Sequence, residues 1–145
     1  IVGEGSEKEK LIQKANKNIQ FISCPSWNEV EAVFYKSKAL IFPGEEDFGM
    51  IPLEVMAYGI PVIAFSKGGA LETVVENTEN IEKSSGLFFP KQSITSINKI
   101  INDFEKIENK FEDGWIRNHA KKFKEYYFLE NFKKIIDKFL KSFLK

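Results

Sequence analysis

The sequence predicts an α/β domain built on a Rossmann-like parallel sheet of about five strands, with helices on both faces of the sheet. Short apolar runs of strand length alternate with segments of helical periodicity over residues 1–90. Each intervening segment is long enough for the crossover that parallel strands require, so the connections are expected to be right-handed. Only helical patterns follow residue 90, which predicts C-terminal helices appended to the sheet.

Five apolar runs are the candidate strands. The first, at residues 1–2, is followed at once by Gly3 and Gly5 and resembles the end of a strand whose beginning precedes the chain. The other four cover residues 19–22, 39–42, 61–65 and 86–90. Because no long linker or repeat interrupts the series, residues 1–145 are expected to form a single domain that is truncated at its N-terminus.

Helix boundaries follow from capping residues and apolar spacing. Ser6 is expected to cap a helix that ends near Asn16, and Ser26 with Glu29 has the spacing of a capping box. The polar residues 76–85 are expected to cross the surface as a loop. The remaining predicted helices cover approximately residues 53–58, 71–75, 93–107, 115–124 and 129–143.

The loop between the third and fourth strands is the most informative stretch. The apolar run 39–42 ends at Pro43-Gly44, and three acids follow before a helix whose first turn carries Pro52. Gly59 is suited to the left-handed conformation that ends a helix. The loop therefore lies at the carboxyl end of a parallel strand, which is where ligands bind in open α/β sheets.

The start of this helix has the chemistry of an anion site. The N–H groups of Gly49, Met50 and Ile51 point out of a helix N-terminus, and Gly49 lets a ligand approach the backbone closely. Glu54 can accept hydrogen bonds from the two hydroxyls of a ribose, or it can simply stabilise the helix by its position. Glu46 precedes the glycine on the loop. Two carboxylates facing one sugar phosphate need different roles, because placing both beside a phosphate is unfavourable.

Three segments carry a resemblance to a known family. Residues 46–54 read EDFGMIPLE and continue as VMAYGIPVIA, residues 68–74 read GGALETV, and residues 2–6 read VGEGS. This series resembles the E-x7-E signature and the flanking segments of the retaining GT-B glycosyltransferases, the glycosyl transferases group 1 family. The matches cover roughly the first half of the chain, in the family's order, which is far more specific than a lone glycine pattern. The resemblance implies the C-terminal, donor-binding domain, which is one half of a GT-B fold.

The resemblance also implies roles for individual residues. Glu46 would be the catalytic residue and would face the transferred sugar. Glu54 would hold the ribose of the donor. The full set expected to bind the donor is Glu54, Phe48, Gly49, Met50 and Ile51, with Gly68 and Gly69 in a loop near the sugar.

The implied reaction transfers a hexose of mannose or glucose type, with retention, from a GDP- or UDP-linked sugar to a glycan or lipid-linked acceptor. The resemblance implies no metal ion and no other cofactor. In this family an arginine and a lysine that neutralise the donor diphosphate lie upstream of the chain, as does the N-terminal acceptor domain. The chain alone is therefore expected to bind nucleotide weakly and to catalyse little, because catalysis depends on positioning both substrates.

Composition bears on the partners and on the location. Lys plus Arg and Asp plus Glu number 21 each, so the net charge gives no argument for nucleic acid as a partner. The single cysteine, Cys24, predicts a reducing compartment, and no apolar run reaches the roughly 18 residues of a membrane span, so a cytoplasmic location is expected. The single histidine, His119, is expected at the surface or half-buried, and no metal site is expected around it.

The lysine-rich C-terminal helix has two interpretations. A basic amphipathic helix can lie on an anionic membrane, which would place the protein peripherally at its inner face. The favoured interpretation is a helix that packs on its own domain with its lysines in water. The resemblance adds that the terminal helix of GT-B enzymes crosses back to the other domain, which would leave its apolar side partly bare in this chain.

Two other functions stay open at this point. A sugar-nucleotide epimerase shares the GT-B architecture and would act on the donor without an acceptor. A non-catalytic domain that only binds a partner would keep the two glutamates without using them. A glycosidase is the least favoured function, because a helix N-terminus and a glycine suit a phosphate better than they suit a bond flanked by two carboxylates.

Overall fold

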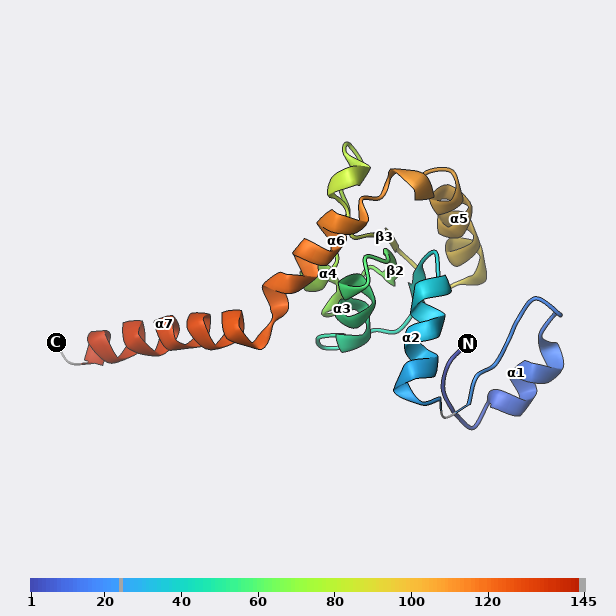
Figure 1. The fold of residues 1–145 in the computed structure, drawn as a ribbon, viewed down its shortest axis with the longest axis horizontal. Coiled ribbons are helices and arrows are strands. Elements are labelled where there is room, and N and C mark those ends of the chain that lie inside the picture. Colours follow the sequence, from blue (N-terminus) through green and yellow to red (C-terminus); the bar gives the residue numbers. More distant parts are fainter. Residues whose placement is uncertain (24, 144–145) are drawn as a thin grey trace. The chain divides into compact units, whose positions relative to one another are not determined.

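The computed structural model describes residues 1–23 and 25–143, so Cys24 and the last two residues lie outside the described residues. The chain divides into two compact units, Ile1–Ser37 and Lys38–Lys145. Figure 1 identifies the helices and strands of both units.

The first unit contains two helices and one parallel bridge. Val2 pairs with Ile22, with a hydrogen bond of 3.0 Å from the amide of Gly3 to the carbonyl of Ile22. The two strands predicted at residues 1–2 and 19–22 are therefore wrong as strands. The reason is that every described residue of this unit is exposed or half-buried, so no core face supports a longer ladder.

The helices of the first unit are α1 (Lys8–Lys14) and α2 (Trp27–Lys36). Helix α1 starts one residue later than predicted and its N-cap is Glu7, so Ser6 does not cap it, contrary to the prediction. The capping box at the start of α2 is confirmed. The Ser26 side chain accepts from the amide of Glu29, and the Glu29 carboxylate accepts from the Ser26 amide at 2.8 Å.

The second unit is built on a parallel sheet of three strands in the order β1-β2-β3. The strands are β1 (Leu40–Phe42), β2 (Val62–Phe65) and β3 (Gly86–Phe89). Leu40 is in register with Val62, and Val62 with Gly86. The predicted runs at residues 39–42, 61–65 and 86–90 are thus confirmed as strands. The sheet has three strands instead of the expected five or so.

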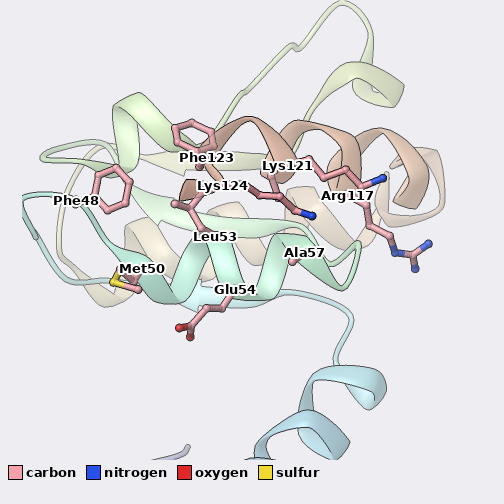
Figure 2. A pocket seen from close by; sticks show the side chains of 10 residues that line it. Phe48, Met50, Leu53, Glu54, Ala57, Arg117, Lys121, Phe123 and Lys124 are labelled. Carbon is pink, nitrogen blue, oxygen red and sulfur yellow. The ribbon is translucent and has the colours of Figure 1, made fainter. Parts of the chain in front are cut away.

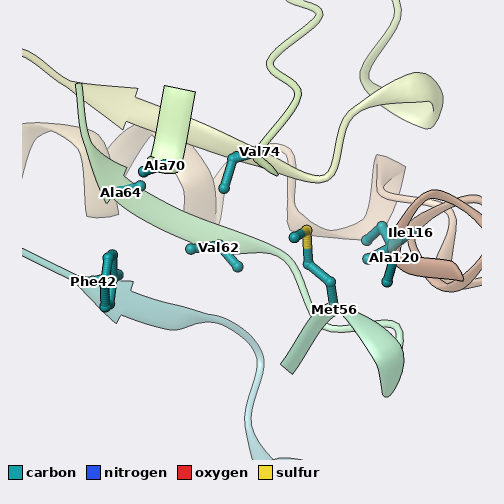
Figure 3. Packing of buried hydrophobic residues seen from close by; sticks show 8 residues of the cluster. All are labelled: Phe42, Met56, Val62, Ala64, Ala70, Val74, Ile116 and Ala120. Atoms are coloured by element: carbon teal, nitrogen blue, oxygen red, sulfur yellow. The ribbon is translucent and has the colours of Figure 1, made fainter. Parts of the chain in front are cut away.

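Helices cover both faces of this sheet. Alternate residues of β2 point to opposite sides, so Val62 and Ala64 join one apolar cluster while Ile63 and Phe65 join another. The first cluster lies under α3 (Met50–Ala57) and α6 (Asp113–Ala120), and Figure 3 shows its packing. The second lies under α5 (Ile94–Glu105), through Phe104. The prediction of a parallel α/β fold with helices on both faces is confirmed.

The segment after α4 (Ala70–Thr73) is more ordered than a surface loop. It forms a short helix η1 (Ile81–Lys83), and the following Ser84 and Ser85 are fully buried. Ser85 Oγ accepts from the amide of Val75 at 2.8 Å, and Ser84 Oγ accepts from the amide of Asn77 at 2.8 Å. The prediction that residues 76–85 all cross the surface as a loop is therefore wrong. Ser84 and Ser85 are buried because their hydroxyls form hydrogen bonds with backbone amides.

The C-terminal helices also differ in detail from their predicted ranges. Ser93, where the predicted helix 93–107 begins, caps α5 by accepting from the amide of Ser96 at 3.2 Å. The predicted helix at 115–124 is two elements, α6 and the short η3 (Lys121–Phe123), and a further turn, η2 (Glu108–Lys110), precedes them.

The last helix is α7 (Glu125–Phe143), and all of its described residues are exposed. The favoured interpretation, in which this helix buries its apolar side on its own domain, is wrong for the described residues. None of the helices in the described part of the chain is both long enough and apolar enough to span a membrane.

Candidate functional site

Two loops at one edge of the sheet form the candidate site. The acid loop, residues 43–49, connects β1 to α3, and the glycine loop, residues 66–69, connects β2 to α4. Because β1 and β2 are parallel neighbours, their carboxyl ends meet at the same edge. The acid loop thus lies at a strand's carboxyl end, as the sequence predicts.

The acid loop and the glycine loop are in direct backbone contact. The amide of Gly69 donates to the carbonyl oxygen of Glu46 at 2.7 Å. A Cβ atom on Gly68 would lie 2.4 Å from that carbonyl oxygen, and one on Gly69 would lie 2.4 Å from both the carbonyl oxygen of Asp47 and the Cα of Phe48. The structure therefore brings Glu46 together with both glycines, and only glycine permits so close an approach.

Helix α3 begins at the end of the acid loop with an uncapped N-terminus. Its N-cap is Gly49, which is buried, adopts a left-handed φ of 76° and provides no side-chain hydrogen bond. Around it the side chains of Phe48, Met50 and Ile51 are 45%, 65% and 48% exposed. Gly49 itself is buried, whereas its neighbours are exposed, and no side chain caps the N–H groups at this end of the helix, which carry a partial positive charge that can attract an anion.

The two glutamates lie on different elements of this edge. Glu46 is exposed on the acid loop, and Glu54 is half-buried on α3. Figure 2 shows that the carboxylate of Glu54 points away from Lys121. Within the described residues neither carboxylate has a hydrogen-bond or ion-pair partner in the protein, so both can accept hydrogen bonds from a ligand.

A hollow of about 400 Å³ lies between α3 and the α6–η3 segment (Figure 2). The rings of Phe48 and Phe123 approach edge to face at its wall, with centroids 6.4 Å apart. The sequence does not predict that Arg117, Lys121 and Lys124 line this hollow, because no local pattern indicates that α6 packs against α3. The residues that line the hollow are Phe48, Met50, Leu53, Glu54, Ala57, Arg117, Ala120, Lys121, Phe123 and Lys124.

Comparison with known proteins decides the family. Residues 1–126 match the family profile described as Glycosyl transferases group 1. The chain belongs to the glycosyl transferases group 1 family. It is 32% identical, over 129 residues, to the alpha-1,3/1,6-mannosyltransferase ALG2 of Kluyveromyces lactis, a match that covers 85% of this chain and 25% of that protein. The chain therefore spans about a quarter of this curated relative.

Solved structures of GT-B glycosyltransferases share the fold. Sucrose-phosphate synthase from Thermosynechococcus elongatus superposes with a TM-score of 0.73 at 19% identity, covering 94% of this chain and 34% of that one. HepE of Anabaena, solved in complex with UDP, superposes with a TM-score of 0.65 at 21% identity, covering 97% and 40%. At these identities the likeness concerns the fold alone.

An ion pair between Lys67 and Glu45 joins the two loops. The Nζ atom of Lys67, on the glycine loop, lies 4.0 Å from a carboxylate oxygen of Glu45, on the acid loop. Both side chains are exposed, so the pair stabilises the fold little. The amide Nε2 of Gln92 also donates to the carbonyl oxygen of Pro43 at 2.8 Å, which holds the first residue of the acid loop.

His119 is buried, contrary to the prediction that it is at the surface or half-buried. It is 7% exposed, and its Nε2 lies 2.7 Å from the carbonyl oxygen of Thr73. The physical reason is that it shares the inner side of α6 with Ile116 and Ala120, which pack into the core. Across the described ranges 1–23 and 25–143, no cluster of three or more His, Cys, Asp or Glu side chains is placed to hold a metal ion.

Proposed function

We propose that this chain is the donor-binding domain of a glycosyltransferase that moves a hexose of mannose or glucose type from a nucleotide-diphosphate sugar to a glycan or lipid-linked acceptor, with retention. The observation that carries the proposal is the contact between Gly69 and Glu46 beside the uncapped start of α3. This edge offers backbone donors for a diphosphate and carboxylates for sugar hydroxyls. The family membership supports it, as does the mannosyltransferase name of the yeast relative.

The donor diphosphate is placed at the N-terminus of α3. The N–H groups of Gly49, Met50 and Ile51 lie there without a side-chain cap, and a helix N-terminus carries about half a positive charge. As the bond from sugar to phosphate breaks, negative charge grows on the leaving diphosphate. Fixed amides that face this charge stabilise the transition state. The match to the family profile Glycosyl transferases group 1 supports a nucleoside diphosphate as the ligand class.

Glu54 is assigned to the ribose. It is half-buried on α3, and no other described group of the protein occupies its carboxylate. Two adjacent hydroxyls can donate to its two oxygens, and hydrogen bonds to a charged group contribute about 1.5–3 kcal/mol each. Its position on the helix that holds the diphosphate matches the short distance between ribose and diphosphate in a nucleotide.

Glu46 is assigned to the transferred sugar, as the catalytic residue. Its backbone is fixed against the glycine loop, while its side chain is exposed. A carboxylate in this position accepts hydrogen bonds from the sugar and stabilises positive charge that develops on the ring during transfer. Glu46 and Glu54 thus have separate tasks, which keeps both carboxylates from crowding one phosphate. Gly68 and Gly69 are assigned to the loop near the sugar, and the absence of a Cβ atom lets that loop contact the backbone of Glu46.

The remaining components belong to the longer protein. We assign the acceptor site to an N-terminal domain of the longer protein, and the arginine and lysine that neutralise the diphosphate to a separate strand-loop-helix that precedes this donor-binding segment. No cofactor and no metal ion takes part in the proposed reaction, and nucleic acid is not a partner. The location is cytoplasmic, with peripheral contact at the inner face of a membrane through α7.

The apolar side of α7 supports this peripheral contact. Eight large apolar residues lie on one side of the helix and are all exposed, while four lysines and three acids occupy the rest of it. Such a helix can lie in the interface of an anionic bilayer. The apolar residues are Phe128, Leu129, Phe132, Ile135, Ile136, Phe139, Leu140 and Phe143.

Turnover of sugar nucleotides by the full-length protein tests the proposed function. GDP- and UDP-linked mannose and glucose are each supplied with and without lipid-linked acceptors, and both the free nucleoside diphosphate and the glycan product are measured. Glu46→Gln is expected to lower turnover by about 100-fold or more while donor affinity changes less than threefold. An acceptor-independent change of the sugar would instead identify an epimerase. Wild-type turnover in Glu46→Gln would remove its catalytic role.

A further inference from the structure

We infer that His119 is a positioning residue, which holds the glycine loop against Glu46 through Thr73. This inference rests on the proposed function. Three contacts form the connection, and they join residues that are far apart in the sequence. His119 Nε2 lies 2.7 Å from Thr73 O, Thr73 Oγ1 donates to Gly69 O at 3.1 Å, and Gly69 N donates to Glu46 O at 2.7 Å.

The direction of the first contact follows from its chemistry. A backbone carbonyl oxygen only accepts hydrogen bonds, so Nε2 of His119 carries the hydrogen and donates it to Thr73. The other ring nitrogen, Nδ1, is buried and has no partner within the described part of the chain. The imidazole therefore makes one polar contact, and that contact is with α4.

The carbonyl that His119 reaches is one that the helix itself cannot satisfy. Thr73 is the last residue of α4, and the final carbonyls of a helix have no intrahelical donor. Thr73 is also fully buried, so water does not replace the missing donor. His119 thus satisfies the C-terminal end of α4 from another helix, and loss of this donor leaves a buried carbonyl unpaired.

Rings hold the imidazole in place for this contact. Trp115 stacks on it with a centroid distance of 5.4 Å and an interplanar angle of 4°, and Phe123 contacts it edge to face at 5.6 Å. Trp115 lies one helical turn before His119 on α6, and Phe123 lies on η3. The orientation of the ring is therefore fixed by packing, which is the arrangement expected of a residue that positions another element.

The other end of α4 is tied to the acid loop. A helix of four residues is not stable by itself, so the position of α4 depends on its contacts. At its N-terminal side the amide of Gly69 is bonded to Glu46, and at its C-terminal side the carbonyl of Thr73 is bonded to His119. If the second contact is lost, the glycine loop can shift against Glu46, and a displacement of about 1 Å can lower turnover about 100-fold.

The inference predicts that loss of the His119 contact changes turnover without changing donor binding. The diphosphate is assigned to the start of α3 and the ribose to Glu54. The hydrogen bonds that join His119, Thr73, Gly69 and Glu46 involve neither Glu54 nor the amides at the start of α3. A variant that loses the His119 donor is therefore expected to lower kcat, while the dissociation constant for the nucleoside diphosphate stays within about twofold of wild type. A residue with only a structural role would change folding yield and both constants together.

Two substitutions of His119 in the full-length protein provide the test. His119→Phe keeps a ring between Trp115 and Phe123 but has no donor, whereas His119→Gln places an amide N–H near the position of Nε2. His119→Phe is expected to lower kcat at least tenfold, and His119→Gln is expected to recover most of that loss. Equal kcat values for the Phe variant and wild type, or equal losses in the two variants, would overturn the inference.

Thr73 gives a second test if His119→Phe does not fold. Thr73→Val removes the hydroxyl that bonds Gly69 and keeps the shape of the side chain, and Thr73→Ser keeps the hydroxyl. Hydrogen exchange is measured at residues 66–73, a readout that does not depend on activity. Faster exchange in Thr73→Val and His119→Phe, but not in Thr73→Ser and His119→Gln, is expected. Unchanged exchange in the first two would contradict the connection, even if the proposed function fails for another reason.

Discussion

The backbone amide of Gly69 donates a 2.7 Å hydrogen bond to the carbonyl oxygen of Glu46. This bond joins the loop after β2 to the loop after β1, and it fixes the backbone of Glu46, a candidate functional acid, relative to Gly69. A site of this kind is set by backbone geometry. Substitutions that add a side chain at Gly68 or Gly69 should therefore disturb the site more than substitutions that shorten the side chains around them.

Gly69→Ala should damage the site and also lower stability. Its Cβ would lie 2.4 Å from backbone atoms of Asp47 and Phe48, which cannot rotate away. Overpacking of this kind costs about 1–3 kcal/mol, measured as the free energy of unfolding in urea. Gly44→Ala in the same acid loop is the matched control, because its nearest neighbour would be a side-chain oxygen of Glu46 at 3.9 Å. A Gly69→Ala protein as stable as wild type would show that the loops are not in contact.

The two methionines of α3 should differ sharply in their effect on stability. Met56 is fully buried in the cluster under α3 and α6, while Met50 is 65% exposed at the start of the helix. Met56→Ala should lower the free energy of unfolding by about 2–5 kcal/mol, since it leaves a cavity. Met50→Ala should change it by less than about 0.5 kcal/mol. Similar losses of unfolding free energy in both variants would show that Met56 does not lie on the buried side of α3.

The capping box of α2 should make the titration of Glu29 unusual. Hydrogen bonds from the hydroxyl and then the amide of Ser26 hold the pKa of the Glu29 carboxyl below its usual value of 4.5. A lowered carboxyl pKa contributes stability that is present above the ordinary pKa and is lost as the pH falls through the folded-state pKa. A carboxyl-carbon NMR titration should therefore show a low midpoint for Glu29.

Serine variants of α2 check the cause of this shift. Ser26→Ala removes the hydroxyl donor and should raise the midpoint of Glu29 part of the way back, since the backbone donor remains. Ser37→Ala, at the other end of the same helix, removes a hydrogen bond to the carbonyl of Val33 and should leave the midpoint where it was. Equal midpoints in wild type and Ser26→Ala would show that the capping box is not formed.

Helix α7 should bind anionic bilayers in the full-length protein. Cosedimentation with vesicles that contain phosphatidylglycerol should exceed that with neutral phosphatidylcholine vesicles, and salt should weaken it. Ile135→Glu places a charge on the exposed apolar side of α7 and should reduce binding at least fivefold. Ile94→Glu adds the same charge at a residue of α5 that is even more exposed than Ile135, and it should not reduce binding. Equal binding by the two variants would mean that α7 does not contact the bilayer.

The central part of the fold could be predicted from the sequence because its signals are local. Each strand of the sheet is an apolar run followed directly by proline or serine, and the capping box of Ser26 and Glu29 follows from a short spacing. Gly59 adopts the left-handed φ of 84° expected at the end of α3. The order of strand, acid loop and helix therefore predicts that the acid loop lies at the carboxyl end of β1, as it does.

Features that depend on contacts distant in the sequence could not be predicted. Apolar residues at 19–22 have the composition of a strand, but in the first unit no described residue is buried, and a single bridge forms. His119 is followed closely by two lysines, which predicts a position near the surface, but it lies on the inner side of α6 with Ile116 and contacts the end of α4. The cations Arg117, Lys121 and Lys124 reach the hollow only because α6 packs against α3.

Calorimetric titration of the full-length protein with UDP and with GDP tests the central claim most directly. That claim is that a nucleoside diphosphate binds at the start of α3 with its ribose on Glu54. For the nucleotide that wild type binds, Glu54→Ala should raise the dissociation constant about tenfold or more, since each hydrogen bond to the carboxylate contributes about 1.5–3 kcal/mol. The control Glu82→Ala, on η1, should bind as wild type does. Equal affinity of Glu54→Ala and wild type would contradict the claim.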